Sequence, residues 1–83
     1  MKNLAEWIKE DPDLVELHGV SPGVDLRQYE FHHESFRAGY VSRRIRGLVV
    51  PYTGRFGVGY QVLIPNWGSS QYCYVRYYIK REA

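Results

Sequence analysis

The segment 72–79 reads Tyr-Cys-Tyr-Val-Arg-Tyr-Tyr-Ile, without a glycine or a proline. Aromatic and β-branched residues at this density are typical of a β-strand, whose side chains point alternately to its two faces. The two faces are Cys73, Val75, Tyr77 and Ile79 on one side, and Tyr72, Tyr74, Arg76 and Tyr78 on the other. Because the first set is the more apolar, we expect it to face the core and the second set to form a contact surface.

Four upstream segments predict further strands. Alternation or short apolar runs mark them at 26–34, 36–45, 48–50 and 60–64. Pro51 is expected to end the third of these strands. The glycine-rich residues 52–59 predict a bent hairpin, and residues 65–70 predict the hairpin loop that leads into the last strand.

The N-terminal residues predict helix instead. Asn3 precedes an amphipathic stretch and stands at capping-box distance from Glu6, which predicts a helix over 4–10. Asp11 and Pro12 are suited to the start of another helix over 11–18. Two short helices or one kinked helix would both satisfy this pattern.

Together these elements predict an α+β fold, with a short N-terminal helix or helix pair packed on a four- to five-stranded curled antiparallel sheet. The sheet could curl into a small, partly open barrel, with glycines at its bulges and corners. At 83 residues, the whole of 1–83 is expected to be a single domain. A core of this size supplies about 3–5 kcal/mol of stability.

The chain has one cysteine, Cys73, so it can form neither an intramolecular disulfide nor a cysteine-based zinc site. We expect a buried structural thiol in a protein of a reducing compartment, the cytoplasm. The first residues lack the apolar stretch of a signal peptide, and no apolar run is long enough to span a membrane.

The charges are sorted between the two halves of the chain. Residues 1–34 contain eight acidic and three basic side chains, whereas 35–83 contain eight basic side chains and one acidic one. Seven of these eight bases are arginines, and the same half holds seven of the eight tyrosines. Guanidinium forks beside tyrosine rings are suited to phosphates, to nucleic-acid bases or to the carboxylates of a partner.

The predicted binding residues belong to this second half. They are Arg37, Arg43, Arg44, Arg46, Arg55, Trp67, Tyr72, Tyr74, Arg76 and Tyr78. Three arginines within 43–46 repel one another unless a polyanion or carboxylates neutralise them, so they either bind an external partner or pair with the acidic half. The tyrosines of 72–78 either stack on bases or lie beneath the N-terminal helix with Trp7 between them.

Two further segments have residues that could bind phosphate or a partner. Residues 54–60 lack the Gly-Lys-Ser/Thr ending of a phosphate-binding loop, so they predict a hairpin to which Arg55 adds a basic side chain. Trp67 lies in a loop between Pro65 and Gly68, where an indole either anchors a partner or folds back on the sheet.

His32, His33 and Glu34, with Glu30 nearby, are the only residues that suggest chemistry. Adjacent histidines on a strand should point to opposite faces and so not chelate together, and the spacing to His18 supports no zinc site. We therefore expect no catalytic residue, no metal, no cofactor and no enzymatic activity.

Two functions agree with these features. The first is binding of DNA or RNA by an Arg/Tyr-rich sheet face, with the acidic segment on the side turned away. The second is inhibition of a nucleic-acid-handling protein complex, in which an acidic face mimics phosphate or the arginines meet an acidic patch. That acidic face is Glu10, Asp11, Asp13 and Glu16.

In size, charge separation and expected lack of activity the chain resembles anti-CRISPR proteins of phages and mobile elements, although no shared motif carries the resemblance. No membrane partner is expected. If the strand 72–79 lies at a sheet edge, it could pair with its copy in a homodimer.

Overall fold

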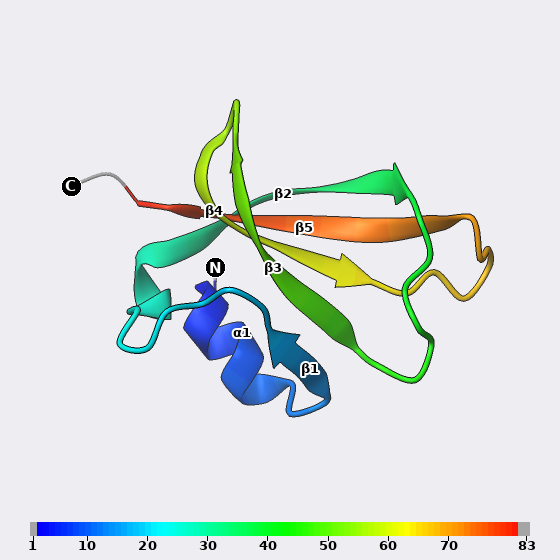
Figure 1. The fold of residues 1–83 in the computed structure, drawn as a ribbon, viewed down its shortest axis with the longest axis horizontal. Helices are drawn as coiled ribbons and strands as arrows, with labels where there is room; N and C mark the ends of the chain where they lie inside the picture. The colour runs from blue at the N-terminus through cyan, green and yellow to red at the C-terminus, as the bar shows by residue number, and fades with distance from the viewer. Residues whose placement is uncertain (1, 82–83) are drawn as a thin grey trace.

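The computed structural model describes residues 2–81. Its elements are α1 (Leu4–Glu10), β1 (Leu14–Leu17), the 3-10 turn η1 (Leu26–Gln28), β2 (Tyr29–Ala38), β3 (Gly47–Gly54), β4 (Gly57–Ile64) and β5 (Tyr72–Lys80). The five strands form one open sheet in the order β1-β3-β4-β5-β2, with α1 packed against it (Figure 1). The predicted α+β fold is therefore confirmed, but the sheet is mixed rather than purely antiparallel, because β1 runs parallel to β3.

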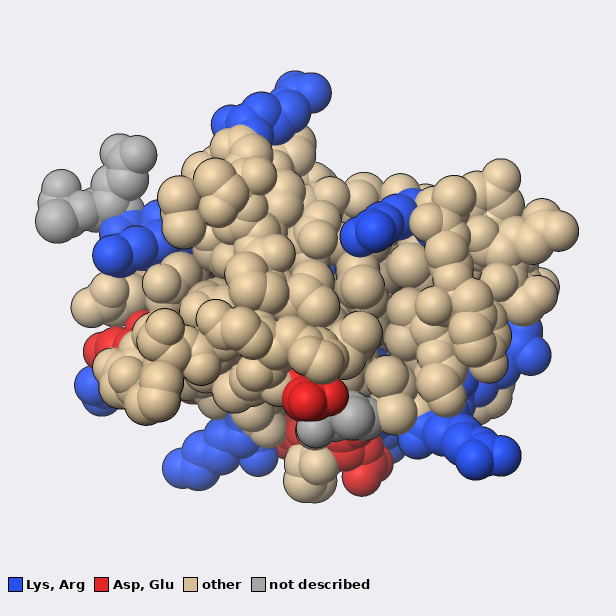
Figure 2. Space-filling view, viewed as in Figure 1, with Lys and Arg blue, Asp and Glu red and all other residues tan. Residues whose placement is uncertain are grey.

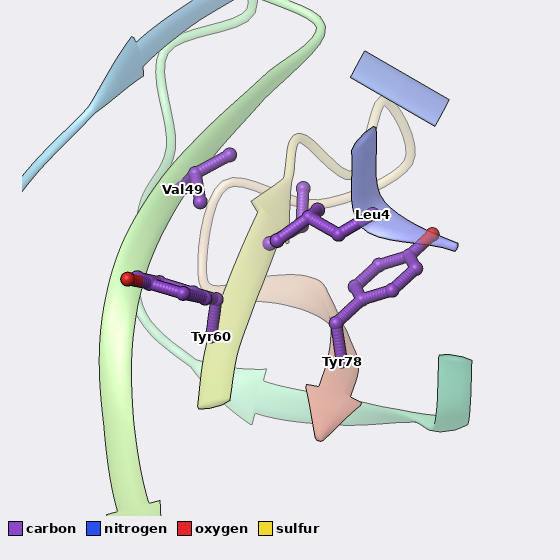
Figure 3. Close-up of a cluster of buried hydrophobic side chains, with 5 residues drawn as sticks. Leu4, Val49, Tyr60 and Tyr78 are labelled. Atoms are coloured by element: carbon purple, nitrogen blue, oxygen red, sulfur yellow. The ribbon is translucent and has the colours of Figure 1, made fainter. Parts of the chain in front are cut away.

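The helix α1 begins as predicted at Asn3. The Asn3 side-chain oxygen accepts a hydrogen bond from the Glu6 backbone N–H at 2.8 Å, and its amide donates to the Glu6 carboxylate at 3.2 Å. Leu4 is fully buried. In Figure 3 it points from α1 toward Val49, Tyr60 and Tyr78, which belong to three different strands.

The predicted second helix over 11–18 is wrong, because Leu14–Leu17 is the parallel edge strand β1. A helix this short gains few hydrogen bonds for the cost of its nucleus, whereas β3 offers a ready row of partners. Leu14 lies opposite Gly47 in this pairing, and its side chain packs over the glycine, where a Cβ would lie 2.8 Å from the end of the leucine. The His18 N–H extends the pairing by donating to the Val49 carbonyl at 3.0 Å.

The predicted strands at 26–34 and 36–45 are one strand, β2, which starts after η1 and ends at Ala38. Gly39, with a φ of +147°, breaks the strand in a conformation that other residues rarely adopt. Residues 39–46 then form a loop that packs Val41 and Ile45 against Cys73 and Val75 of β5.

The strand β3 passes through Pro51 instead of ending there. Pro51 lies opposite Tyr60 of β4 and beyond the last residue of β1, so its missing N–H leaves no neighbour unpaired. The glycine-rich segment that follows is the predicted hairpin, with Arg55 and Phe56 at its turn. In Figure 1 this turn projects on the side away from α1.

The sheet carries a hydrophobic cluster on each face. Leu4, Val49, Tyr60, Val62 and Tyr78 form the cluster beneath α1. Val41, Cys73 and Val75 form the other beneath the loop 39–46. The expected core face of 72–79 is confirmed by Cys73 and Val75, but Tyr78 of the opposite face is also buried, because both faces of β5 are covered.

β5 lies between β4 and β2, so the expected edge at 72–79 is wrong. The open edges of the sheet belong to β1 and β2. Within residues 2–81, no helix is long and apolar enough to cross a membrane.

Candidate functional site

A groove of about 800 Å³ opens beside the C-terminal end of α1, where two loops meet β5. Four arginines and three aromatic rings line it, together with Asp11 and Asp13. The four arginines and three aromatic residues are Arg43, Arg44, Arg46, Arg76, Trp7, Trp67 and Tyr74. We call this site the arginine groove. It brings together six of the ten predicted binding residues, which lie up to 33 positions apart in the chain.

The basic residues of the chain do not coat one face of the sheet as expected. Figure 2 shows basic atoms in separate groups, most of them around the rim and one within the face, with acidic atoms beside them at the left and lower edges. Arg37 pairs with Cys73 in the register of β2 and β5 and so lies on the face opposite Arg76. Arg55 lies in the turn between β3 and β4, away from the groove.

Local hydrogen bonds fix the loop that carries three of the arginines. The Arg44 N–H donates to the Ser42 hydroxyl at 3.3 Å, and the Ile45 N–H donates to the Ser42 carbonyl at 3.3 Å. Ile45 packs on the second core cluster and anchors the turn. Because the segment is a turn and not the predicted strand, Arg43, Arg44 and Arg46 all reach the same groove instead of alternating between two faces.

Of the three arginines within 43–46, Arg46 is the one that pairs with the acidic half. Its Nε lies 3.2 Å from an Asp13 carboxylate oxygen and 3.9 Å from one of Asp11. The Arg46 backbone N–H also donates to the Asp13 carbonyl at 3.3 Å. The expectation that the acidic segment is turned away from the arginines is therefore wrong, because β1 and its preceding turn lie against the loop 39–46.

Arg76 is held at the floor of the groove between a carboxylate and an indole. Its Nε donates to Glu34 of β2 at 2.8 Å, and its guanidinium carbon lies 5.2 Å from the centre of the Trp7 ring. Burial opposes the charge of Arg76, but the hydrogen bond and charge of Glu34 raise its pKa above the ordinary value. The guanidinium thus stays cationic and fixed in place.

Trp67 is the most exposed aromatic residue of the groove, with 71% of its surface accessible. The Asn66 side chain accepts a hydrogen bond from the Gly68 N–H at 2.9 Å and so orders the loop. The Arg43 guanidinium lies 6.0 Å from the centre of the indole ring. The indole therefore does not fold back on the sheet, and its role as an anchor for a partner stays a prediction.

The tyrosines of β5 divide between core and surface. Tyr78 is 3% exposed and stacks with Trp7 at a ring separation of 6.0 Å, so for this residue the alternative of a ring beneath the helix is correct. Tyr74 lines the groove and contacts Phe36 at 4.6 Å between ring centres. Tyr72 is half exposed and lies outside the groove lining.

Sequence patterns missed the part that Trp7 plays in the groove. Its helical spacing indicates a core residue, and the ring does pack on the first cluster. No signal in the sequence places its ring beneath the Arg76 guanidinium, because that contact joins α1 to β5.

The four acidic residues proposed for a partner face each contact a base of the same chain. Glu10 pairs with Lys2, Glu16 lies 3.2 Å from the His18 ring, and Asp11 and Asp13 contact Arg46. Glu10, Asp13 and Glu16 are more than half exposed in these contacts, so water and salt screen the pairs and they add little to stability.

The two adjacent histidines do not point to opposite faces as predicted. A β-bulge between Phe31 and His33 inserts an extra residue and turns both rings to one side. Their Nδ1 atoms lie 2.7 Å apart, and His33 stacks on Tyr77 with ring centres 4.4 Å apart. Within residues 2–81, no group of three or more His, Cys, Asp and Glu side chains is placed to hold a metal ion.

His33 predicts a pH dependence of stability. Burial, and then the charges of His32 and Arg55, lower the pKa of His33 below its ordinary value of 6.5. The unfolded chain therefore takes up this proton more readily, and the folded state should lose stability as the pH falls through 6.5 toward the lower folded pKa. Thermal melts at about pH 7.5 and 5.5 should show a smaller loss for His33→Phe, which keeps a ring on Tyr77, than for the wild type. The assignment to His33 would be wrong if the wild type and His33→Phe lost the same stability at the lower pH. It would also be wrong if His18→Gln reduced the loss as much as His33→Phe does.

Comparison of the chain with protein-family models, with curated proteins and with solved structures found no match in any of the three.

Proposed function

We propose that this chain is a non-enzymatic binding protein of the cytoplasm that holds DNA or RNA in the arginine groove. One observation carries the proposal: four guanidinium groups and three aromatic rings from separate segments line a single groove. Phosphates are neutralised by arginines, and bases stack on aromatic rings, so the two halves of a nucleotide each have a partner there.

The charges of the groove favour a polyanion. Its four arginines outnumber its two aspartates. Arg46 and Arg76 have carboxylate partners, whereas Arg43 and Arg44 are both exposed and, within the described part of the chain, neither lies within 4.0 Å of a carboxylate. These two side chains can meet phosphates without first losing an internal ion pair.

Fluorescence anisotropy of labelled DNA and RNA, single- and double-stranded, at about 50 and 200 mM salt tests the proposal. We expect binding at low salt that weakens as salt is added, because phosphate contacts release counterions. Absence of binding to every nucleic acid at the lower salt would contradict the proposed function.

Asp13 should weaken nucleic-acid binding, because its carboxylate occupies Arg46 and repels phosphate. Asp13→Asn should raise the affinity about threefold, the range expected from releasing one exposed ion pair. Glu16→Gln is the matched control, since it also removes one negative charge from the same segment. The Glu16 carboxylate contacts His18, and neither residue lines the groove. Equal gains in the two variants would indicate an effect of net charge alone.

A second candidate function is inhibition of a nucleic-acid-handling effector of the anti-CRISPR kind. It is favoured by the exposed aromatic residues Phe36, Tyr40 and Tyr72, of which 63%, 65% and 50% of the surface is accessible. The internal pairing of Asp11 and Asp13 favours nucleic-acid binding over phosphate mimicry. Inhibition of a defined nuclease that is abolished by Phe36→Ser, without any binding of nucleic acid, would support the second candidate.

A further inference from the structure

Guanidiniums and indoles are paired in the arginine groove rather than segregated. Arg43 lies over Trp67 at 6.0 Å, and Arg76 lies over Trp7 at 5.2 Å, both measured from the guanidinium carbon to the ring centre. Trp67 is nevertheless 71% exposed, and hydrogen bonds from Gly68 and Ser69 to Asn66 order its loop. An exposed indole on an ordered loop beside a cation is a stacking surface already in place, so the loop loses little entropy on binding.

We infer that the groove takes single-stranded nucleic acid, with phosphates on Arg43 and Arg44 and a base stacked on Trp67. This inference rests on the proposed function and makes it specific. A ring can stack only on the face of an unpaired base, because neighbouring base pairs cover these faces inside a duplex. Duplex binding would use the arginines alone and leave the exposed indole without a partner.

The carboxylates of the groove act against a duplex as well. Asp11 and Asp13 line the same groove as the arginines, and they also border a second hollow that Lys2 and Glu10 line. A single strand needs cations along one backbone only, whereas a duplex carries twice the density of phosphate and brings a second backbone toward these carboxylates. The cationic part of the groove is therefore matched to one strand.

The groove should discriminate only weakly between nucleotide sequences. Among its described lining residues there is neither an asparagine nor a glutamine, the side chains that pair with adenine in bidentate fashion. Arginine can pair with guanine in the same way, but two of the four arginines are assigned to phosphates here and the other two already have carboxylate partners. Stacking on an indole tolerates every base, because each base has a π-face. We expect affinities for oligonucleotides of different composition to differ less than affinities for single and double strands.

The test is a competition experiment with an oligonucleotide of about 10 nucleotides, in single-stranded form and annealed to its complement. The single strand should compete at least about tenfold better than the duplex. Trp67→Leu should weaken binding of the single strand by about tenfold or more and leave duplex binding unchanged, while Trp67→Phe keeps most of the affinity. Tyr40→Leu is the matched control, because Tyr40 is 65% exposed and lies outside the groove lining.

A second readout reports the stacked base directly. In Trp7→Phe, Trp67 is the only indole, and the single strand should quench its fluorescence. Equal binding of duplex and single strand, or unchanged binding by Trp67→Leu with the wild-type circular dichroism spectrum, would overturn the inference and leave the proposed function standing. Absence of any binding by the wild type would overturn both.

Discussion

Replacing Gly59 with alanine should destabilise the protein by about 3 kcal/mol and lower its melting temperature by about 10–20 °C. Gly59 lies opposite Ile79 where β4 and β5 pair. A Cβ there would stand 2.0 Å from the Tyr78 carbonyl oxygen and 2.9 Å from the Ile79 Cα. Both are backbone atoms, so the two central strands would have to separate beside the buried ring of Tyr60.

The matched control is Gly68→Ala, where the nearest atom to a new Cβ is the Asn66 side-chain oxygen at 3.4 Å. This variant should melt within about 3 °C of the wild type, as expected for a surface substitution. Melting curves followed by circular dichroism provide the comparison. If Gly59→Ala melted together with Gly68→Ala, the close approach of β4 and β5 would be wrong.

Replacing Arg43, Arg44 and Arg46 together with alanine should weaken nucleic-acid binding about 100-fold at about 50 mM salt. The loss of Arg43 and Arg44 removes two phosphate contacts, so the slope of log affinity against log salt should fall by about 1.4 for a single strand. The fold should survive, because within residues 2–81 the only ion pairs lost are those of Arg46 with Asp11 and Asp13.

The double variant Arg37→Ala/Arg55→Ala separates a local effect from one of net charge. Both residues are exposed arginines of the basic half, and both lie outside the groove. It should reduce the affinity by less than about threefold and keep the salt slope within about 0.5 of the wild type. A loss as large as that of the triple variant would indicate attraction by net charge rather than a groove.

Elements defined by local sequence could be predicted. The cap at Asn3, the helix that follows it, the hairpin turn at Arg55 and the strand 72–79 each depend on residues within a few positions. In all of these the hydrophobic period, capping residue or turn glycine agrees with the final fold.

Elements defined by distant partners could not be predicted. β1 is a strand because it pairs with β3, which lies about 30 positions further along the chain, although Asp11 and Pro12 are typical of a helix start. The bulge at His33 changes the direction in which two side chains point, but the alternation of apolar and polar residues in the sequence does not reveal it. In both cases tertiary contacts override local preference.

The candidate site also has one part that local sequence predicts and one part that it does not. The abundance of arginine and the loop position of Trp67 already indicated these residues as candidates for binding. Their convergence with Arg76 and Asp13 depends on how the loop 39–46 folds across the sheet, which local patterns do not contain. The structure therefore replaces a broad basic face with one groove.

The most direct measurement is a map of amide chemical-shift changes in 15N-labelled protein titrated with a single-stranded oligonucleotide. We predict the largest changes in the loop 43–46, around Trp67 and at Tyr74 and Arg76, with Arg55 and Phe56 unaffected. Changes centred on the β3–β4 turn, or spread evenly over the basic residues, would contradict the arginine groove as the binding site.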